Sequence, residues 1–592
     1  MATITHAATL DGVTDFTVMG TVYEWDTNRF LSTVDRWGGT GPDINVFALT
    51  LQGDFYLGAL RLPGSMSRTV IVDTNDGIGR DIDFMRLGGL GGTVTLTTTH
   101  VGTLTSSGPG AVTLSIGSAG MESLFLGGAN NRVTVSSFLD SADFGSGKDS
   151  LKLLGDGHVN NVDMGNGDSI VSVANGWINM LLTADGNDTI TVGSGYIQAL
   201  SMGRGANKLS IGSGNVNSVL AWEGNDTVTL GAGGWIDSMN LGGGGSNVTL
   251  AAGAGISSFQ SGDGNDNVTL NGSSRIFLLK LDGGNNTVTS ANGNIESYYS
   301  YGGNNTLNIG AGGIQQVVLS GDGGTHVVNA TGFVGSLQVY DNATTTVNLS
   351  GDADAIMLGE GNDRVTTGNG YVQLINAGDG NNIITLGTGG AGFIRTGDGD
   401  DLFRLNTLNP VYGVVLQGGG GSGTNTADFS QIGVAITVSF NRYDYQSIGD
   451  LTGADDPSIG YFSFVQFQNM LGTGLGDRLE GNESGNRLSG GLGNDTLSGL
   501  AGSDVMIGGR GNDSLTGGAD ADTFEFSAGG GRDRVSGFVA GVDAIDFTNA
   551  VSMASITFAS FGTGVLLTVG TTEVVVENTT VAVMNDAGNF IF

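Results

Sequence analysis

A short motif recurs along the middle of this chain at a nearly constant spacing, and this repeat restricts the fold more than any other feature. The segments TADGNDTIT, AWEGNDTVT, SGDGNDNVT and LGEGNDRVT lie at multiples of 19 or 20 residues from one another. A fixed period of this length is typical of repeat architectures, in which each repeat packs only against its neighbours. We therefore expect stacked coils rather than the several globular domains that 592 residues would otherwise suggest.

Two ladders become visible when the repeats are aligned. The first is apolar, with steps of 18 to 20 residues: Val133, Leu151, Ile170, Ile190, Leu209, Val228, Val248, Val268, Val288, Leu307, Val327, Val347, Val365, Ile384 and Phe403. The second lies two residues earlier and holds short polar side chains: Asn131, Asp149, Asp168, Asp188, Asn207, Asp226, Ser246, Asp266, Asn286, Asn305, Thr325, Thr345, Asp363, Asn382 and Asp401. Such side chains bond back to the backbone of turns.

Two short strands fit within each period. One follows the acidic turn and alternates polar and apolar residues, as in DTVTL, and the other follows a glycine-rich turn, as in GAGGWIDSMNL. No helix-length segment separates them, so the pattern predicts an all-β fold, a parallel β-solenoid of about 16 coils over residues 86–404. The 108 glycines fit this prediction, because tight turns between closely stacked coils require positive φ angles.

The period changes to nine residues at Gly472, where six units run from GTGLGDRLE to GGADADTFE. The units that begin at Gly490 and Gly508 match the calcium-binding solenoid repeat G-G-x-G-x-D-x-U-x throughout, where U is a large apolar residue. Each unit supplies half a coil, so residues 18 apart stack. Stacked carboxylates repel one another unless a cation lies between them, and Ca²⁺ accepts 6–8 oxygen ligands in flexible geometry.

The sequence therefore predicts calcium sites along both edges of these coils. Asp477, Asp495 and Asp513 would line one edge, and Asn486, Asp504 and Asp522 the other, with Asn486 the weakest ligand. Backbone carbonyls of the turn glycines would complete the shells. The candidate glycines are Gly490, Gly491, Gly493, Gly508, Gly509, Gly511, Gly517 and Gly518.

These units resemble the RTX (repeats-in-toxin) family of proteins exported by type I secretion. The following segment, GGADADTFEFSAGGGRDRVSGFVAGVDAIDF, resembles the part that closes serralysin-type RTX proteins, and the chain ends in NDAGNFIF, an acidic residue followed by an apolar tail, as in type I secretion signals. The resemblance implies a strand-rich connector over 405–471, a calcium β-roll over 472–540 and a C-terminal β segment with the secretion signal over 541–592. It also implies a protein secreted to the cell surface of a Gram-negative bacterium.

Two parts of the chain leave alternatives open. The mixed Asp, Asn, Ser and Thr ladder of residues 86–404 favours a hydrogen-bonded structural column, in which Asp149, Asp168 and Asp188 are the candidates for additional cation sites because they are consecutive acids. Residues 1–85 lie outside the repeat and predict either a β-rich cap over the first coil or an attachment module, because an open solenoid end exposes unpaired strand edges.

The composition and the absence of known catalytic motifs limit the classes of function that the sequence supports. A net charge of −35 disfavours nucleic acid and anionic lipid, and no apolar run reaches the roughly 20 residues of a membrane span. The absence of cysteine excludes thiol chemistry, and neither H-E-x-x-H nor G-x-S-x-G occurs. We expect a non-enzymatic, calcium-dependent structural protein that self-associates into a lattice or filament. The alternatives are an adhesin that binds polysaccharide such as cell-envelope glycan, and, less favoured, a polysaccharide-modifying enzyme.

Overall fold

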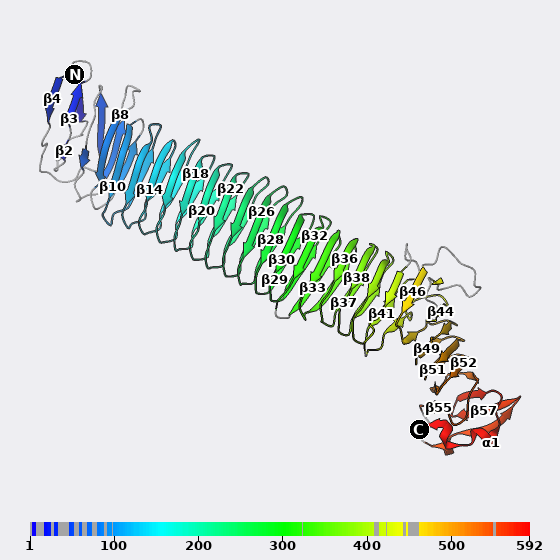
Figure 1. The fold of residues 1–592 in the computed structure, drawn as a ribbon. Coiled ribbons are helices and arrows are strands. Elements are labelled where there is room, and N and C mark those ends of the chain that lie inside the picture. The colour runs from blue at the N-terminus through cyan, green and yellow to red at the C-terminus, as the bar shows by residue number, and fades with distance from the viewer. Residues whose placement is uncertain are drawn as a thin grey trace. The chain divides into compact units, whose positions relative to one another are not determined.

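The computed structural model describes residues 100–321, 324–407, 414–421, 423–441, 461–548 and 552–592, with the strands that precede residue 100 and the short strand Gln446–Ser447. It comprises two compact units, Met1–Tyr299 and Ser300–Phe592. The chain is an all-β parallel β-solenoid of about 23 turns with almost no helix, which confirms the predicted fold class (Figure 1). The prediction of about 16 coils counted residues 86–404 alone and is lower than this total.

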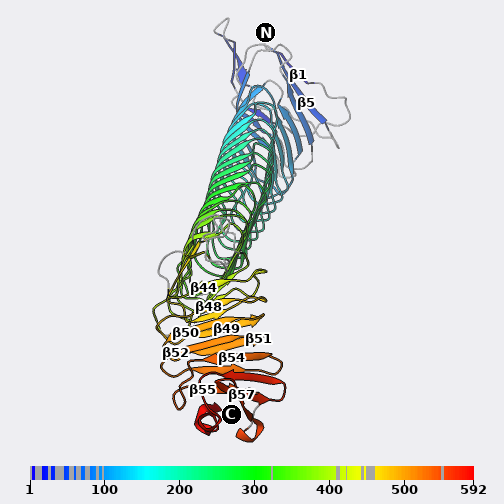
Figure 2. The same ribbon diagram turned by 90° about the vertical axis from the view of Figure 1, so that its right-hand side faces the viewer.

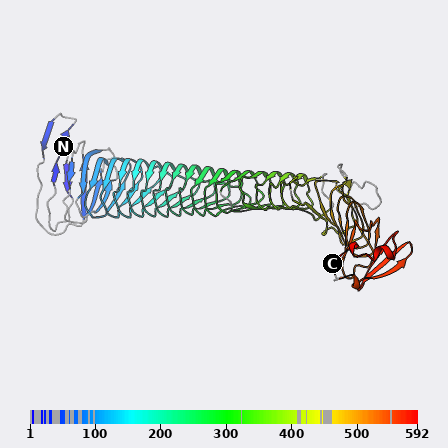
Figure 3. The same cartoon turned by 60° about the horizontal axis from the view of Figure 1, so that its bottom comes forward.

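In unit 1, each coil contributes one strand to each of two parallel sheets (Figure 3). The first sheet contains β9 (Gly92–Leu96), β11 (Val112–Ile116), β13 (Arg132–Val135), β15 (Ser150–Leu153), β17 (Ile170–Val173), β19 (Thr189–Val192), β21 (Lys208–Ile211), β23 (Thr227–Leu230), β25 (Asn247–Leu250), β27 (Asn267–Leu270) and β29 (Asn286–Ser290). The second contains β8 (Arg80–Leu87), β10 (Thr99–Ser106), β12 (Met121–Leu126), β14 (Phe138–Asp143), β16 (His158–Asp163), β18 (Trp177–Leu182), β20 (Tyr196–Ser201), β22 (Asn215–Leu220), β24 (Trp235–Asn240), β26 (Gly255–Ser261) and β28 (Arg275–Leu281), and β30 (Asn294–Ser300) ends at the unit boundary.

The apolar ladder forms the core between these sheets. Leu151, Ile190 and Leu209 are fully buried, as predicted. The predicted ladder is wrong at Ile170, which is 54% exposed, because Val171 pairs with Leu151 and Ile190 and takes the inward position. Since side chains on a strand alternate between faces, a register error of one residue moves the whole strand's pattern to the opposite face.

The N-terminal strands of unit 1 are β1 (Thr3–His6), β2 (Thr17–Met19), β3 (Thr21–Glu24), β4 (Arg29–Thr33), β5 (Val46–Gln52), β6 (Ala59–Arg61) and β7 (Arg68–Asp73). Parallel pairing already links β5 to β7 and β7 to β9, so coil stacking begins before the expected boundary at residue 86. β1 adds to β5 in the antiparallel sense. β1 thus pairs with one edge of β5, and an edge strand that stays unpaired is open to pairing with other chains.

The described strands of unit 2 belong to three sheets. The first consists of β31 (Asn305–Ile309), β33 (Thr325–Ala330), β35 (Thr344–Leu349), β37 (Arg364–Thr367), β39 (Ile383–Leu386), β41 (Leu402–Leu405), β43 (Thr426–Asp428), β47 (Asn469–Leu471), β49 (Arg487–Leu492), β51 (Val505–Arg510), β53 (Thr523–Phe526), β55 (Ala544–Phe547) and β59 (Phe590–Ile591). The second consists of β32 (Ile314–Leu319), β34 (Val334–Val339), β36 (Ala353–Met357), β38 (Val372–Asn376), β40 (Ala391–Arg395), β42 (Val414–Gln417), β46 (Tyr461–Val465) and β45 (Gln446–Ser447).

The third sheet of unit 2 begins with a strand ahead of the nine-residue repeats and continues through strands of the repeats (Figure 2). It consists of β44 (Thr437–Ser439), β48 (Arg478–Glu480), β50 (Thr496–Ala501), β52 (Ser514–Ala519), β54 (Arg532–Ser536), β58 (Thr572–Val576), β57 (Gly564–Val569) and β56 (Thr557–Phe561). The helical segments are α1 (Val581–Met584), η1 (Met553–Ser555) and η2 (Ala587–Asn589). Among the described residues, no helix is long and apolar enough to cross a membrane.

The inner ladder of unit 2 also departs from the prediction at one coil. Val328, rather than Val327, is buried and pairs with Leu307 and Val347. The polar position two residues earlier is therefore occupied by the buried His326, whereas Thr325 is exposed.

Candidate metal centre

The aspartates predicted in the nine-residue repeats form two buried columns in unit 2, as their 18-residue spacing required. Asp477, Asp495 and Asp513 immediately precede β48, β50 and β52, and Asn486, Asp504 and Asp522 immediately precede β49, β51 and β53. Their exposed fractions lie between 1% and 3%. Each column therefore withdraws several neighbouring carboxyl groups from water, which is costly without compensation.

One oxygen of each carboxylate is used to hold the coils together. The backbone N–H of Asp477 donates to Oδ1 of Asp495 (2.7 Å), and that of Asp495 donates to Oδ1 of Asp513 (2.8 Å). In the other column, the N–H of Asp504 donates to Oδ1 of Asp522 (3.0 Å). These bonds repeat at every coil and align the two sheets.

The columns extend one coil beyond the repeats. The N–H of Asp513 donates to Oδ1 of Asp533, and that of Asp522 donates to Oδ1 of Asp543, both at 3.0 Å. Neither residue was predicted from the nine-residue repeats, because the spacing increases to 20 and 21 residues here. Each precedes a buried apolar residue, Val535 or Ile545, by two positions, and this signal would have identified them.

Four aspartates in the described part of the roll have a second carboxylate oxygen, Oδ2, without a protein partner. Oδ2 of Asp495, Asp504, Asp513 and Asp522 is buried and accepts no hydrogen bond. Asp477 differs, because its Oδ2 accepts the N–H of Thr473 (2.6 Å). Asn486 differs as well, since its Nδ2 donates to the carbonyl of Gln468 (3.1 Å), so it needs no cation.

Each unpartnered oxygen faces a space that only glycine leaves open. A Cβ on Gly490 would overlap Oδ2 of Asp495 and would lie 2.6 Å from the carbonyl oxygen of Gly508 in the next coil. The same pairing occurs at Gly499, where a Cβ would overlap Oδ2 of Asp504 and lie 2.7 Å from the carbonyl oxygen of Gly517. We call such a space a glycine cradle: a buried, unpartnered carboxylate oxygen beside the glycine five residues before it. Cradles also occur at Gly508 beside Asp513 and at Gly517 beside Asp522, and a glycine carbonyl from the next coil adjoins the cradles at Gly490 and Gly499.

The remaining predicted glycines shape the turns around the cradles. Gly491, Gly493, Gly509, Gly511 and Gly518 all have φ angles between +105° and +145°. Leu500 stands where the motif has its second glycine and adopts φ +82°. Bulky side chains rarely adopt this conformation, so the turn geometry is maintained at a local cost in strain. Gly499 completes a cradle and was not among the predicted residues, although its place as the first residue of a unit indicates it.

Burial also changes the acidity of these groups. The pKa of Asp495 and that of Asp504 are raised to about 7, because burial disfavours the charged form and neighbouring aspartates add like charge. The pKa of Asp522 is raised to about 6 for the same reasons. Without a counter-charge, the roll therefore holds carboxyl groups that resist ionisation at neutral pH.

The donor set fits calcium. No group of three or more His, Cys, Asp or Glu side chains converges in the described residues, so a metal shell must draw on backbone carbonyls. Calcium accepts carboxylate and backbone carbonyl oxygens in flexible geometry, whereas zinc prefers nitrogen and sulfur ligands. The cradles at Gly490 and Gly499 present both oxygen types that calcium takes, a carboxylate and a backbone carbonyl.

The central aspartates Asp149, Asp168 and Asp188 do not form the consecutive acid column that the sequence predicted. Asp168 is turned outward, 41% exposed, and pairs with Nζ of Lys148 at 2.8 Å. Ser169 takes its place in the buried column, and the N–H of Ser169 donates to Oδ1 of Asp188 (2.8 Å). The same one-residue register shift that exposes Ile170 causes this correction.

In unit 1, acidic and neutral residues alternate strictly along the central column once Ser169 is in place. From the first coil with a polar column residue, the order in unit 1 is Asn131, Asp149, Ser169, Asp188, Asn207, Asp226, Ser246, Asp266 and Asn286. Two buried carboxyl groups are therefore separated by two coil spacings, which halves their Coulomb repulsion relative to adjacent coils. In the roll, by contrast, the acids follow one another directly.

The central coils also lack glycine cradles. The position five residues before each central aspartate carries a side chain: Phe144 before Asp149, Thr183 before Asp188, Ala221 before Asp226 and Ser261 before Asp266. Oδ2 of these aspartates is likewise unpartnered, but the residue five positions earlier has a side chain where the roll has glycine. This geometry favours the structural, hydrogen-bonded interpretation of the central column.

A pH dependence follows from the central column. Burial raises the pKa of Asp188 to about 6 and that of Asp363 to about 7, against 3.8 for the unburied group. The folded state therefore binds more protons than the unfolded state between these values, and the stability that protonation provides is present below pH 4 and lost as the pH rises through 6–7. In calcium-free buffer we expect the thermal midpoint to fall between pH 5.5 and 8, measured by circular dichroism.

Asp363→Asn is the matched variant for this measurement, since asparagine occupies equivalent column positions such as Asn382. This substitution should reduce the change of the thermal midpoint with pH. A midpoint that rises over the same interval would contradict the assignment of these raised pKa values.

The comparisons with known proteins agree with the roll geometry. Residues 471–506 and 498–535 match the RTX calcium-binding nonapeptide repeat, in 4 copies. The chain thus carries RTX calcium-binding repeats, which confirms the resemblance inferred from the sequence. No curated protein matches the sequence.

Among solved structures, the crystal structure of the extracellular lipase LipA from Serratia marcescens aligns with 19% sequence identity and a TM-score of 0.16. The alignment covers 43% of this chain and 45% of the lipase chain. The chain therefore spans less than half the length of that protein.

Proposed function

We propose that this protein is a secreted, non-enzymatic structural protein of the bacterial cell surface, which folds on binding calcium and assembles with further copies of itself into a surface layer or extracellular assembly. The observation that carries the calcium part is the series of four glycine cradles beside Asp495, Asp504, Asp513 and Asp522. A cation in each cradle would supply the counter-charge that the protein does not, with carboxylate and carbonyl oxygens as its ligands.

Calcium also explains how secretion and folding are coupled in this proposal. Binding that requires the folded turns stabilises only the folded state, so calcium outside the cell would drive folding of the roll. In the low calcium of the cytoplasm, the buried acids of adjacent coils would keep the roll unfolded and the chain ready for type I export. RTX repeats support secretion by this route.

The structural role rests on repetition and charge. The described coils repeat the same parallel backbone register from one coil to the next, which offers regularly spaced positions for contacts between copies. A net charge of −35 makes copies repel one another, and bound calcium lowers that charge. Assembly should therefore require calcium.

We expect electron micrographs of the purified full chain to show ordered sheets or filaments in millimolar calcium and dispersed particles in EGTA. Magnesium at equal concentration is the control, because it retains its hydration shell and suits carbonyl-rich sites poorly. Monomers that persist in millimolar calcium at high protein concentration would contradict the structural role, while leaving calcium binding by the roll intact.

A further inference from the structure

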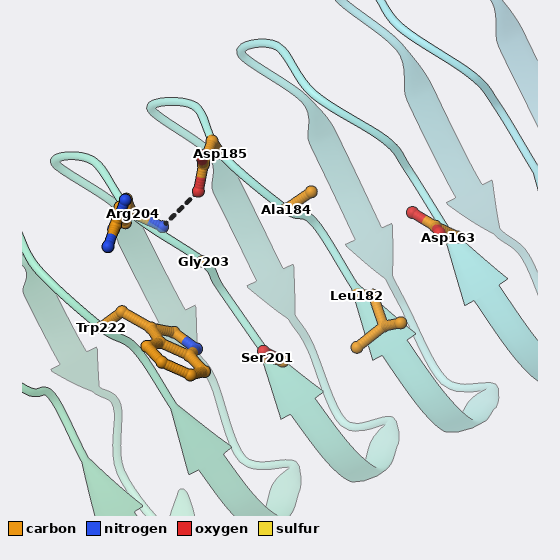
Figure 4. A pocket seen from close by; sticks show the side chains of 8 residues that line it. All are labelled: Asp163, Leu182, Ala184, Asp185, Ser201, Gly203, Arg204 and Trp222. Carbon is orange, nitrogen blue, oxygen red and sulfur yellow. Dashed lines mark hydrogen bonds between the residues drawn. The ribbon is translucent and has the colours of Figure 1, made fainter.

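A hollow of about 360 Å³ lies on the outer surface of the second sheet of unit 1, where several strands of this sheet end (Figure 4). Its principal lining residues are Asp163, Leu182, Asp185, Ser201, Arg204 and Trp222. Figure 4 shows the indole of Trp222 at one end of the hollow and Asp163 at the other. A hydrogen bond from the backbone N–H of Arg204 to Oδ1 of Asp185 (3.2 Å) fixes the turns that form one wall.

A second hollow, of about 130 Å³, adjoins the first and shares Asp163 and Leu182 with it. It extends to Phe125. Strand pairing aligns Phe125 with Asp143, Asp143 with Asp163, Asp163 with Leu182 and Leu182 with Ser201, so the lining residues follow one row across consecutive coils. We call the two hollows together the coil groove. With coils about 4.8 Å apart, it runs for roughly 24 Å along the stack.

The coil groove combines exposed apolar side chains with anchored carboxylates. Phe125, Met180 and Trp222 are 48%, 41% and 57% exposed. Between them, Oδ1 of Asp143 accepts the N–H of Gly145 (2.9 Å) and Oδ1 of Asp163 accepts that of Gly165 (2.8 Å). These bonds orient the carboxylates, and each carboxylate has further lone pairs that face solvent.

This pattern suits one class of ligand better than others. A sugar ring offers an apolar face that stacks on an aromatic side chain and a rim of hydroxyl groups that donate to carboxylates. The groove is open and long, which fits an extended chain rather than a compact small molecule. A protein interface would need a more continuous apolar centre, and here charged residues interrupt the apolar side chains.

The charge of the coil groove limits the class of ligand further. Three carboxylates, those of Asp143, Asp163 and Asp185, line the coil groove against the single guanidinium of Arg204. The side chain of Arg204 also lies 3.6 Å from that of Glu223. A polymer of uronic acids or phosphates would be repelled.

We propose that the coil groove binds a polysaccharide that carries hydroxyl or amino groups and no acid groups, laid along the coil stack. Trp222 stacks against one sugar ring, and Asp163 accepts hydrogen bonds from hydroxyl groups of the same polysaccharide. This function goes beyond the proposed calcium-dependent assembly and does not rest on it, because the groove lies on coils without glycine cradles.

The test uses the full chain in calcium-containing buffer and three hexasaccharides: a neutral β-glucan, a chitosan and a polygalacturonate. Binding is measured by isothermal calorimetry and by indole fluorescence. We expect the neutral and amino-bearing oligomers to bind and the acidic one not to bind. Trp222→Ala should raise the Kd on the order of tenfold, the effect of losing one stacked aromatic contact. Asp163→Asn should weaken binding by a smaller factor.

Tyr340→Ala is the matched control, since Tyr340 is an aromatic side chain of unit 2 that is 68% exposed. It should leave the affinity unchanged. The proposal is overturned if neither non-acidic oligomer binds, if polygalacturonate binds equally well, or if Trp222→Ala and Asp163→Asn bind like the unmodified protein. It is also overturned if Trp222→Ala abolishes self-association while no sugar binds, since the groove would then be an interface between copies. Assembly in calcium tests the structural role separately.

Discussion

Replacing Asp495 and Asp513 together by asparagine should prevent the roll from folding at millimolar calcium. Asparagine retains an Oδ1 that can accept the N–H of the preceding coil, so the hydrogen-bonded column is kept. The change removes only the charged oxygens that face the glycine cradles. Because calcium affinity depends on the number of charged ligands, we expect the calcium concentration needed for folding to rise on the order of a hundredfold or more. Calcium titrations followed by circular dichroism measure this shift.

Asp226→Asn is the matched control, because it makes the same substitution at a column position of the central coils, outside the roll. Asp226 holds the same column position, and its Oδ1 accepts the N–H of Asn207 (2.9 Å). Ala221 stands five residues earlier, where a cradle has glycine. Asparagine already occupies neighbouring column positions, where Nδ2 of Asn207 donates to the carbonyl of Gly205. The calcium response should therefore be unchanged in Asp226→Asn. An equal loss in both variants would mean that the column, and not the cradles, responds to calcium.

Removal of calcium by EGTA should unfold the roll while the central coils stay folded. Immediately before β50, β51, β52 and β53, the acids of the columns follow one another from coil to coil, and four of their oxygens lack partners. In the central coils, acidic and neutral residues alternate, and hydrogen bonds such as that from the N–H of Asp188 to Oδ1 of Asn207 (3.0 Å) need no cation. Amide hydrogen exchange in EGTA should thus show loss of protection over 472–540 and retained protection over 130–290.

Calcium readdition supplies the internal control for this experiment, since protection of the roll should return without change in the central coils. Uniform protection with and without EGTA would contradict the account. Loss of protection along the entire chain would show instead that the central coils depend on the roll, as expected if the roll nucleates their stacking.

The fold and the two aspartate columns of the roll could be predicted because both depend on spacing alone. A period of nine residues places every second unit in register, whatever the details of the turns. Register within a single strand is harder to infer. Both errors occurred where two β-branched residues are adjacent, at Ile170–Val171 and Val327–Val328. Either residue satisfies the apolar ladder, and only pairing with the neighbouring coils decides which one points inward.

The distinction between the roll and the central coils could not be inferred from the acidic ladder. Both columns hold buried aspartates with one unpartnered oxygen, and both use Oδ1 to bind the next coil. What separates them is the residue five positions earlier, glycine in the roll and a side chain in the central coils. Its importance depends on the close approach of a carbonyl from the next coil, which appears only once the coils are stacked.

Anomalous diffraction from crystals grown in calcium tests the central claim most directly. We predict calcium peaks beside Asp495, Asp504, Asp513 and Asp522, next to the glycines that precede them by five residues, and none beside Asp226 or Asp266. A roll without calcium, or peaks spread equally along the central column, would contradict it.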